Sequence, residues 1–190
     1  AFLFAQQNHP YIMILGTLQD GGSPHIGCSK DCCKVFDSNK KVSSIALIDP
    51  IAKKRFLFDA TPDMVSQWRM LNDSLHLPYN SMPNGVFLTH AHIGHYTGLM
   101  YFGREALGSK NIPVYALPRM KSYLENNGPW SQLTTLNNIL LKVIHSGEKT
   151  IVTEELQVEA IRVPHRDEYS ETAGFLISSK NKKALFIPDI

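Results

Sequence analysis

The chain has 190 residues, 43% of them hydrophobic, and a formal net charge of +2 at pH 7. This length and composition predict one domain, or part of one, with a single substantial core. The low charge and the lack of a long basic run argue against nucleic acid as a partner. Charge alone does not exclude the end of an RNA strand as a substrate. No apolar run approaches the roughly 20 residues of a membrane-spanning helix. We therefore expect a small-molecule substrate. The sequence carries no signal for an oligomeric state.

The two ends of the chain carry their own expectations. Residues 1–10 begin without Met and run from an apolar start through Ala5 to polar residues, as the tail of a secretion signal does. A frayed terminus gives the same pattern. An exported protein, periplasmic or extracellular, is thus one expectation and a cytoplasmic protein the other. Residues 183–190 end on strand-like sequence without a turn or cap, so we expect a domain at 11–190 that lacks its C-terminal part.

Hydrophobic periodicity predicts sheets covered by helices, an α+β architecture. The predicted strands are 11–17, 42–49, 55–60, 85–89, 112–117, 137–144, 156–165, 172–179 and 183–190, with a hairpin turn at 50–54. One helix is predicted at 61–75, where Thr61 is a candidate N-cap and Pro62 stands first. Further helices are predicted at 96–107 and, with a proline again at the start, at 118–127.

All three cysteines lie in one glycine-rich loop, residues 18–34: Cys28, Cys32 and Cys33. Adjacent cysteines rarely pair with each other because the geometry is strained. Three neighbouring thiolates are instead a natural zinc ligand set that needs a fourth ligand. That ligand is expected to be His25 or a residue beyond position 190. A disulfide or simple burial stays open as the alternative, particularly in an exported protein.

The stretch "LTHAHIGHYTGL", residues 88–99, places three of the eight histidines within six positions. It lies where a predicted buried strand meets a predicted helix. Because residues two apart face the same way in an extended segment, His90 and His92 can point at one position, and His95 approaches it from the first helical turn. Neutral imidazoles suit zinc better than calcium or magnesium. A group of partly exposed histidines at a helix start is the alternative, and the setting favours a metal site.

Three more polar residues stand where predicted apolar strands end: Asp59, His165 and Asp189. Burial at such positions is costly without a partner. Taken singly, each is more often a cap or turn residue, but their common placement beside the histidine cluster indicates possible ligands. The remaining histidines have no such setting, and no role in this cluster is assigned to them: His9, His25, His76 and His145.

On these residues the sequence resembles the metallo-β-lactamase fold superfamily. The resemblance rests on "THAHIGHYTGL", "FLFDATPD", "VPHRDEYSETAGFLI" and "FIPDI", whose order and intervals fit along nearly all of residues 11–190. It implies an αββα four-layer sandwich with a one- or two-metal site, usually zinc, at the sheet edge. By this resemblance His90, His92 and His165 hold the first metal, His95 and Asp189 serve the second with Asp189 bridging both, and Asp59 braces the site through hydrogen bonds.

Within the superfamily, "ILGTLQDGGSPHIGC" and the cysteines after it are most similar to two types of protein. These are the B protein of pyrroloquinoline quinone biosynthesis and the cyclic phosphodiesterase of phosphonate catabolism, which commonly bind a structural zinc in this loop. Two features depart from the family pattern: Gly94 occupies the place of the signature Asp, and the last histidine of the second site has no counterpart. We therefore expect one firmly held metal and at most a weak second one. The few carboxylates favour zinc over manganese.

The leading hypothesis is a metallo-hydrolase that uses a zinc-bound hydroxide on a phosphodiester or another ester. Asp189 and His95 are the candidate catalytic residues, with Asp189 orienting the attacking water. Two alternatives stay open. One is an oxidative, iron-dependent enzyme resembling the quinone-biosynthesis B protein, and the other is a non-catalytic zinc-binding protein.

Overall fold

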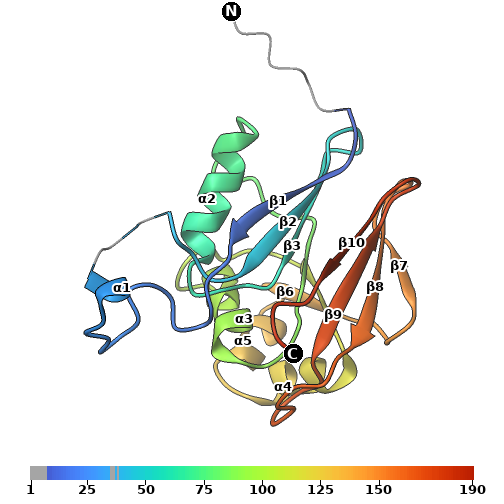
Figure 1. Ribbon diagram of the computed structural model, residues 1–190. Coiled ribbons are helices and arrows are strands. Elements are labelled where there is room, and N and C mark those ends of the chain that lie inside the picture. Colours follow the sequence, from blue (N-terminus) through green and yellow to red (C-terminus); the bar gives the residue numbers. More distant parts are fainter. Residues whose placement is uncertain (1–7, 35–36, 38) are drawn as a thin grey trace, which may run out of the picture.

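The computed structural model describes residues 8–34, 37 and 39–190, and two packed β-sheets form its centre (Figure 1). The first sheet has the strand order β1-β2-β3-β4-β5-β6, and the second has the order β10-β9-β8-β7. The first comprises β1 (Tyr11–Gly16), β2 (Ser44–Asp49), β3 (Lys54–Phe58), β4 (Gly85–Phe87), β5 (Ile112–Ala116) and β6 (Ile139–Val143). The second comprises β7 (Lys149–Ile151), β8 (Gln157–Arg162), β9 (Ala173–Ser178) and β10 (Lys183–Phe186).

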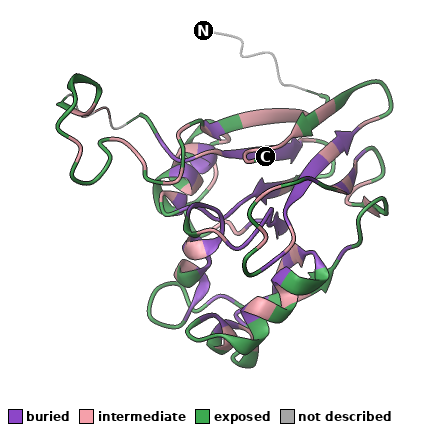
Figure 2. Ribbon diagram, turned by 60° about the horizontal axis from the view of Figure 1, so that its bottom comes forward, coloured by how far each residue is buried: buried purple, intermediate pink, exposed green. Residues whose placement is uncertain are grey.

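Helices cover one face of the first sheet. They are α2 (Met64–Ser74), α3 (Ile93–Tyr96), the 3₁₀ helix η1 (Thr97–Phe102), α4 (Pro118–Asn126) and α5 (Trp130–Thr135), while α1 (Asp31–Lys34) lies in the cysteine loop. Buried side chains such as Leu71 of α2 and Leu124 of α4 form one apolar cluster with Leu57 and Val114 of the sheet. Figure 2 shows buried residues concentrated in the strands, with exposed residues on the outer turns of the helices.

The strand directions bring several chain ends to one edge. Strands β3, β4, β5 and β6 are parallel, so their carboxyl ends lie together. Strands β8 and β10 both pair antiparallel with β9, so their carboxyl ends also share an edge. The two edges meet, because the backbone N–H of Ala173 donates to the carbonyl of Thr89 at 3.0 Å. Side chains that follow β3, β4, β8 and β10 are therefore gathered in one place.

An aromatic cluster holds the two sheets against each other. The rings of Phe58 and Phe87 stack with centroids 5.0 Å apart, and the ring of Phe175 from the second sheet meets them edge-on at 5.3 and 5.6 Å. All three side chains are fully buried. Edge-to-face rings combine the burial of apolar surface with favourable ring geometry. This contact therefore fixes the relative position of the two sheets and of the edge at which the ends of β3, β4, β8 and β10 meet.

Two predicted helices have different bounds in the structure. The helix predicted at 96–107 is broken into α3, η1 and a series of turns. The break falls at Gly98, whose backbone N–H donates to the Ala60 carbonyl outside the helix at 2.8 Å. This approach needs glycine, because a Cβ there would be 2.8 Å from Cβ of Met64. The helix predicted at 61–75 begins at Met64, because residues 61–63 form a turn in which the Thr61 hydroxyl accepts a hydrogen bond from the N–H of Asp63.

Other elements were predicted incompletely. Strand β10 ends at Phe186, so Asp189 lies in the segment after the strand rather than at its last position. The short elements α1, α5 and β7 were not predicted, since each has six residues or fewer and too few buried positions to show a period. Of the expected N-terminal tail, residues 1–10, only 8–10 lie within the described part of the chain.

The successive layers are helices, sheet and sheet. The resemblance implied a fourth, helical layer. Among the described residues no helix packs on the outer face of the second sheet, where the side chain of Leu185 is 58% exposed (Figure 1). Within the same residues, no helix has both the length and the apolar composition to cross a membrane.

Candidate metal centre

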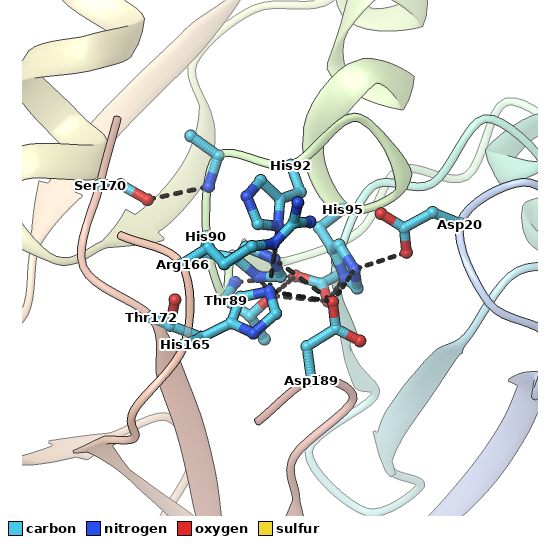
Figure 3. A network of polar contacts seen from close by, with 12 residues as sticks. Asp20, Thr89, His90, His92, His95, His165, Arg166, Ser170, Thr172 and Asp189 are labelled. Atoms are coloured by element: carbon cyan, nitrogen blue, oxygen red, sulfur yellow. Dashed lines mark hydrogen bonds and ion pairs between the residues drawn. The ribbon is translucent and has the colours of Figure 1, made fainter. Parts of the chain in front are cut away.

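Three histidines and one aspartate converge where the two sheet edges meet (Figure 3). Nδ1 of His92 lies 2.8 Å from Nε2 of His90 and 3.1 Å from Nε2 of His165. Oδ2 of Asp189 lies 3.5 Å from Nε2 of both His90 and His165. Zinc–nitrogen bonds of about 2.0 Å imply ligand separations of about 3.3 Å around a tetrahedral ion. The donor types and their separations therefore fit a zinc ion.

A buried hydrogen-bond chain determines which nitrogen of His90 faces this point. The Asp59 carboxylate accepts hydrogen bonds from both the backbone N–H and the hydroxyl of Thr89, at 2.8 to 3.0 Å. Because that hydroxyl has one proton and gives it to Asp59, its oxygen accepts from Nδ1–H of His90 at 3.0 Å. The other ring nitrogen, Nε2, therefore carries a lone pair directed at His92.

A second contact sets the tautomer of His92. Its Nε2 lies 2.9 Å from Oε2 of Glu168, and a carboxylate can only accept, so Nε2 of His92 carries the proton. Nδ1 of His92 then presents a lone pair to the centre. The hydrogen bond from His92 also lowers the pKa of the Glu168 carboxyl. An outer carboxylate that orients a ligating imidazole in this way is a common feature of metal sites.

The two lone pairs face each other at 2.8 Å, which is an unfavourable arrangement of two acceptors. Burial, together with the positive charge of His95, lowers the pKa of His90 to about 2, so His90 is a neutral imidazole near neutral pH and its Nε2 carries no proton while Nδ1–H donates to Thr89. A cation between the rings removes the repulsion. The donor set of His90, His92, His165 and Asp189 can therefore hold a metal ion.

His95 belongs to a second, adjoining group. Its Nδ1 lies 2.7 Å from Oδ2 of Asp59, while its Nε2 lies 3.0 Å from Oδ1 of Asp20 and 3.5 Å from Oδ2 of Asp189. Burial alone would lower the pKa of His95, but the Asp59 and Asp20 carboxylates raise it to about 10. Asp189 thus lies within reach of both groups.

The backbone at Asp59 has an uncommon conformation. Its φ of 66° lies in the left-handed region, which aspartate tolerates better than most residues. This turn follows β3 directly and carries a fully buried carboxylate to Thr89 and His95. Strain of this kind, of order 1–3 kcal/mol, persists where the surrounding contacts fix it.

The structure brings together every histidine and aspartate predicted for the site. The sequence prediction missed Asp20 and Glu168. Asp59 and Asp189 were selected because they follow predicted apolar strands. Asp20 stands four residues after the end of β1, so the same criterion could have selected it if it had been extended into the glycine-rich loop. Glu168 lies in the polar loop after His165, where nothing in the sequence separates it from its charged neighbours.

The three cysteines lie close together and away from the histidines. A disulfide joins Cys28 to Cys33, and the exposed thiol of Cys32 lies 3.9 Å from Sγ of Cys33. The three sulfur atoms lie within 4.8 Å of one another and can also be read as a metal ligand set. His25, expected as a possible fourth ligand, is not part of this group, and its Nδ1 contacts the carbonyl of Ile26.

Comparison with solved structures shows the same fold in other proteins. Zn²⁺-bound PqqB from Methylobacterium extorquens has a TM-score of 0.73 and 22% identity, over 92% of this chain and 63% of that one. A new diphosphatase from the PhnP family has a TM-score of 0.63 and 21% identity, over 88% of this chain and 61% of that one. The metallo-β-lactamase fold protein YhfI from Bacillus subtilis has a TM-score of 0.59 and 9% identity, over 93% and 61%.

The chain thus spans about three fifths of the length of these neighbours. No curated protein sequence matches it significantly. The model of the beta-lactamase superfamily domain matches residues 54–190, which is most of the chain and includes all the histidines of the centre. The resemblance drawn from the sequence, including the likeness to the PqqB and PhnP types, is confirmed. The chain belongs to the beta-lactamase superfamily.

Proposed function

We propose that this chain is a metal-dependent hydrolase that holds zinc at His90, His92 and His165, with Asp189 beside them. One observation carries the proposal: two imidazole lone pairs face each other at 2.8 Å with their tautomers set by Thr89 and Glu168. The likeness to Zn²⁺-bound PqqB and to a PhnP-family diphosphatase supports both the metal and the reaction class.

The chain's own residues suit hydrolysis. A zinc ion held there supplies a Lewis acid that makes water a nucleophile near neutral pH. Asp189 is the proposed orienting group, because its carboxylate lies 3.5 Å from three imidazoles and its side chain keeps 30% exposure toward solvent. His95, whose Nδ1 contacts the Asp59 carboxylate, is proposed as the second catalytic residue beside Asp189.

The surroundings favour a negatively charged substrate. Arg166 follows His165 directly, is 73% exposed and lies beside the histidines in Figure 3. Its Nη1 lies 3.9 Å from Oε1 of Glu168, so the guanidinium adds an exposed positive charge next to the carboxylate that orients His92. Guanidinium groups bind phosphate well. We therefore favour a phosphodiester over a neutral ester as the substrate class.

The test is turnover by the zinc-loaded chain on bis-para-nitrophenyl phosphate and para-nitrophenyl acetate, with and without a chelator. We expect zinc-dependent hydrolysis of the phosphodiester that His92→Ala abolishes. His145→Ala changes an exposed histidine that belongs to neither ligand group, and it is expected to leave the hydrolysis intact. Hydrolysis that survives full metal removal would contradict the proposal. Turnover that requires ferrous iron and oxygen would favour the oxidative alternative. A melting temperature that falls on metal removal, without turnover of either substrate, would favour a non-catalytic zinc-binding protein.

The cysteine loop is proposed to hold a structural zinc when its thiols are reduced. The three sulfur atoms already lie within 4.8 Å of one another, so little movement separates the disulfide from a thiolate site. Thiolates are strong zinc ligands, whereas an oxidising compartment favours the disulfide. The state of this loop therefore depends on where the chain is located, and an exported chain would carry the disulfide.

A further inference from the structure

Gly94 stands where the superfamily signature has an aspartate, and another residue fills the space beside it. A Cβ placed at Gly94 would lie 2.6 Å from Oδ1 and 2.8 Å from Cβ of Asp20. Asp20 comes from the glycine-rich loop after β1, more than 70 residues earlier in the chain. The carboxyl group of Asp20 thus occupies the volume that a side chain at position 94 would take.

This carboxylate points at a ligand atom of the site (Figure 3). Oδ1 of Asp20 lies 3.0 Å from Nε2 of His95, and Oδ2 of Asp189 lies 3.5 Å from the same nitrogen. One oxygen or nitrogen from each of these residues lies within 4.8 Å of the others. Nδ1–H of His95 donates a hydrogen bond to the Asp59 carboxylate. The other ring nitrogen, Nε2, therefore remains to interact with the carboxylates of Asp20 and Asp189.

A divalent cation suits this arrangement better than a proton. A proton on Nε2 of His95 can be donated fully to only one of the two carboxylates, and the other then lies near it without a hydrogen bond. A doubly charged ion is attracted by both carboxylates and accepts a lone pair from the imidazole. Two oxygens and one nitrogen from separate parts of the chain form an open ligand set of the kind that catalytic metal sites use.

We infer that Asp20 supplies, from the loop after β1, the carboxylate that position 94 lacks, and that it forms a second divalent-cation site with His95 and Asp189. This inference rests on the proposed function, because Asp189 is shared with the first metal. It replaces the expectation that Gly94 leaves the second site weak. Gly94 and Asp20 are then a matched pair, since a side chain at 94 and the carboxyl of Asp20 exclude each other.

The test is the zinc stoichiometry of the chain and its variants, measured by equilibrium dialysis and elemental analysis. Asp20→Asn keeps the shape of the side chain and removes its charge, so it is expected to lose one equivalent of zinc relative to the parent. Any zinc at the cysteines contributes equally to both proteins and cancels in the difference. Asp31→Asn changes an exposed aspartate of the same loop and is expected to lose none.

The double variant Asp20→Gly with Gly94→Asp places a carboxylate from position 94 in the volume that the Asp20 carboxyl occupies in the parent. It is expected to recover the equivalent that Asp20→Asn loses, whereas Gly94→Asp alone collides with Asp20 and lowers the melting temperature. A full complement of zinc in Asp20→Asn would overturn the inference. If His92→Ala still lost one equivalent in that case, the proposed function would stand without it. If His92→Ala lost none, the proposed function itself would fail.

Discussion

The carboxylate of Asp59 lies 2.7 Å from Nδ1 of His95, and both side chains are buried. Three donors surround this carboxylate, two of them from Thr89. Asp59→Asn would bring two amide N–H groups into this ring of donors, at a cost of about 1–3 kcal/mol for a buried polar group left unpaired. We expect a lower melting temperature and zinc affinity reduced about 10- to 100-fold. Unchanged zinc affinity, equal to that of the exposed control Asp73→Asn, would contradict the bracing role.

Thr89 connects Asp59 to His90 through one hydroxyl group. Thr89→Val removes this hydroxyl at nearly constant volume, so the tautomer of His90 is no longer fixed. We expect zinc affinity to fall about 10- to 100-fold, as for other residues behind a metal ligand. Thr89→Ser retains the hydroxyl and is expected to restore most of the affinity. Competition with a chromogenic chelator measures both, and equal affinities for the two variants would argue against the relay.

Glu168 orients His92 from the solvent side, with its side chain 46% exposed. Glu168→Ala removes the acceptor for Nε2–H of His92, and we expect zinc affinity to drop by about tenfold. Glu168→Gln keeps an acceptor oxygen and is expected to lose less. Glu148→Ala, an exposed change in the loop before β7, serves as the control. An affinity order other than parent, Gln variant, Ala variant would contradict this role.

The cysteine loop gives a prediction that depends on redox state. With the thiols reduced, Co²⁺ is expected to give the near-ultraviolet charge-transfer band of thiolate ligation, and Cys32→Ser is expected to weaken it. With the Cys28–Cys33 disulfide intact, the band is expected to be absent. Absorption titration with Co²⁺ distinguishes this site from the histidine centre, which has no sulfur ligand. No band in the reduced chain would mean that the loop holds no metal.

Much of the centre could be predicted because its signals are local. The triplet His90, His92 and His95 is compact in sequence, and the strand before it is plainly apolar. Asp59, His165 and Asp189 follow apolar segments, and parallel or alternate strands bring such ends to one edge. The strand pattern therefore predicted which residues meet, although it placed Asp189 at the end of a strand that stops at Phe186.

The rest depends on contacts that no local pattern records. The sequence showed that position 94 lacks a carboxylate, but the residue that fills the space lies in a glycine-rich loop without periodicity. Whether Asp20 reaches His95 is decided by how that loop folds over α3. The broken helix after His95 has a similar cause, since the close approach of Gly98 to the backbone at Thr61 is a tertiary contact that overrides helical spacing.

In the proposed metal centre, one ion joins the two sheets through the histidines. The zinc affinity of the parent chain and of His165→Ala tests this, because His165 follows β8 of the second sheet and the other two histidines follow β4 of the first. We expect His165→Ala to lose one bound zinc or to bind it at least 100-fold more weakly, while His145→Ala matches the parent. Equal zinc affinity in the parent and in His165→Ala would show that no metal ion joins the two sheets through His165.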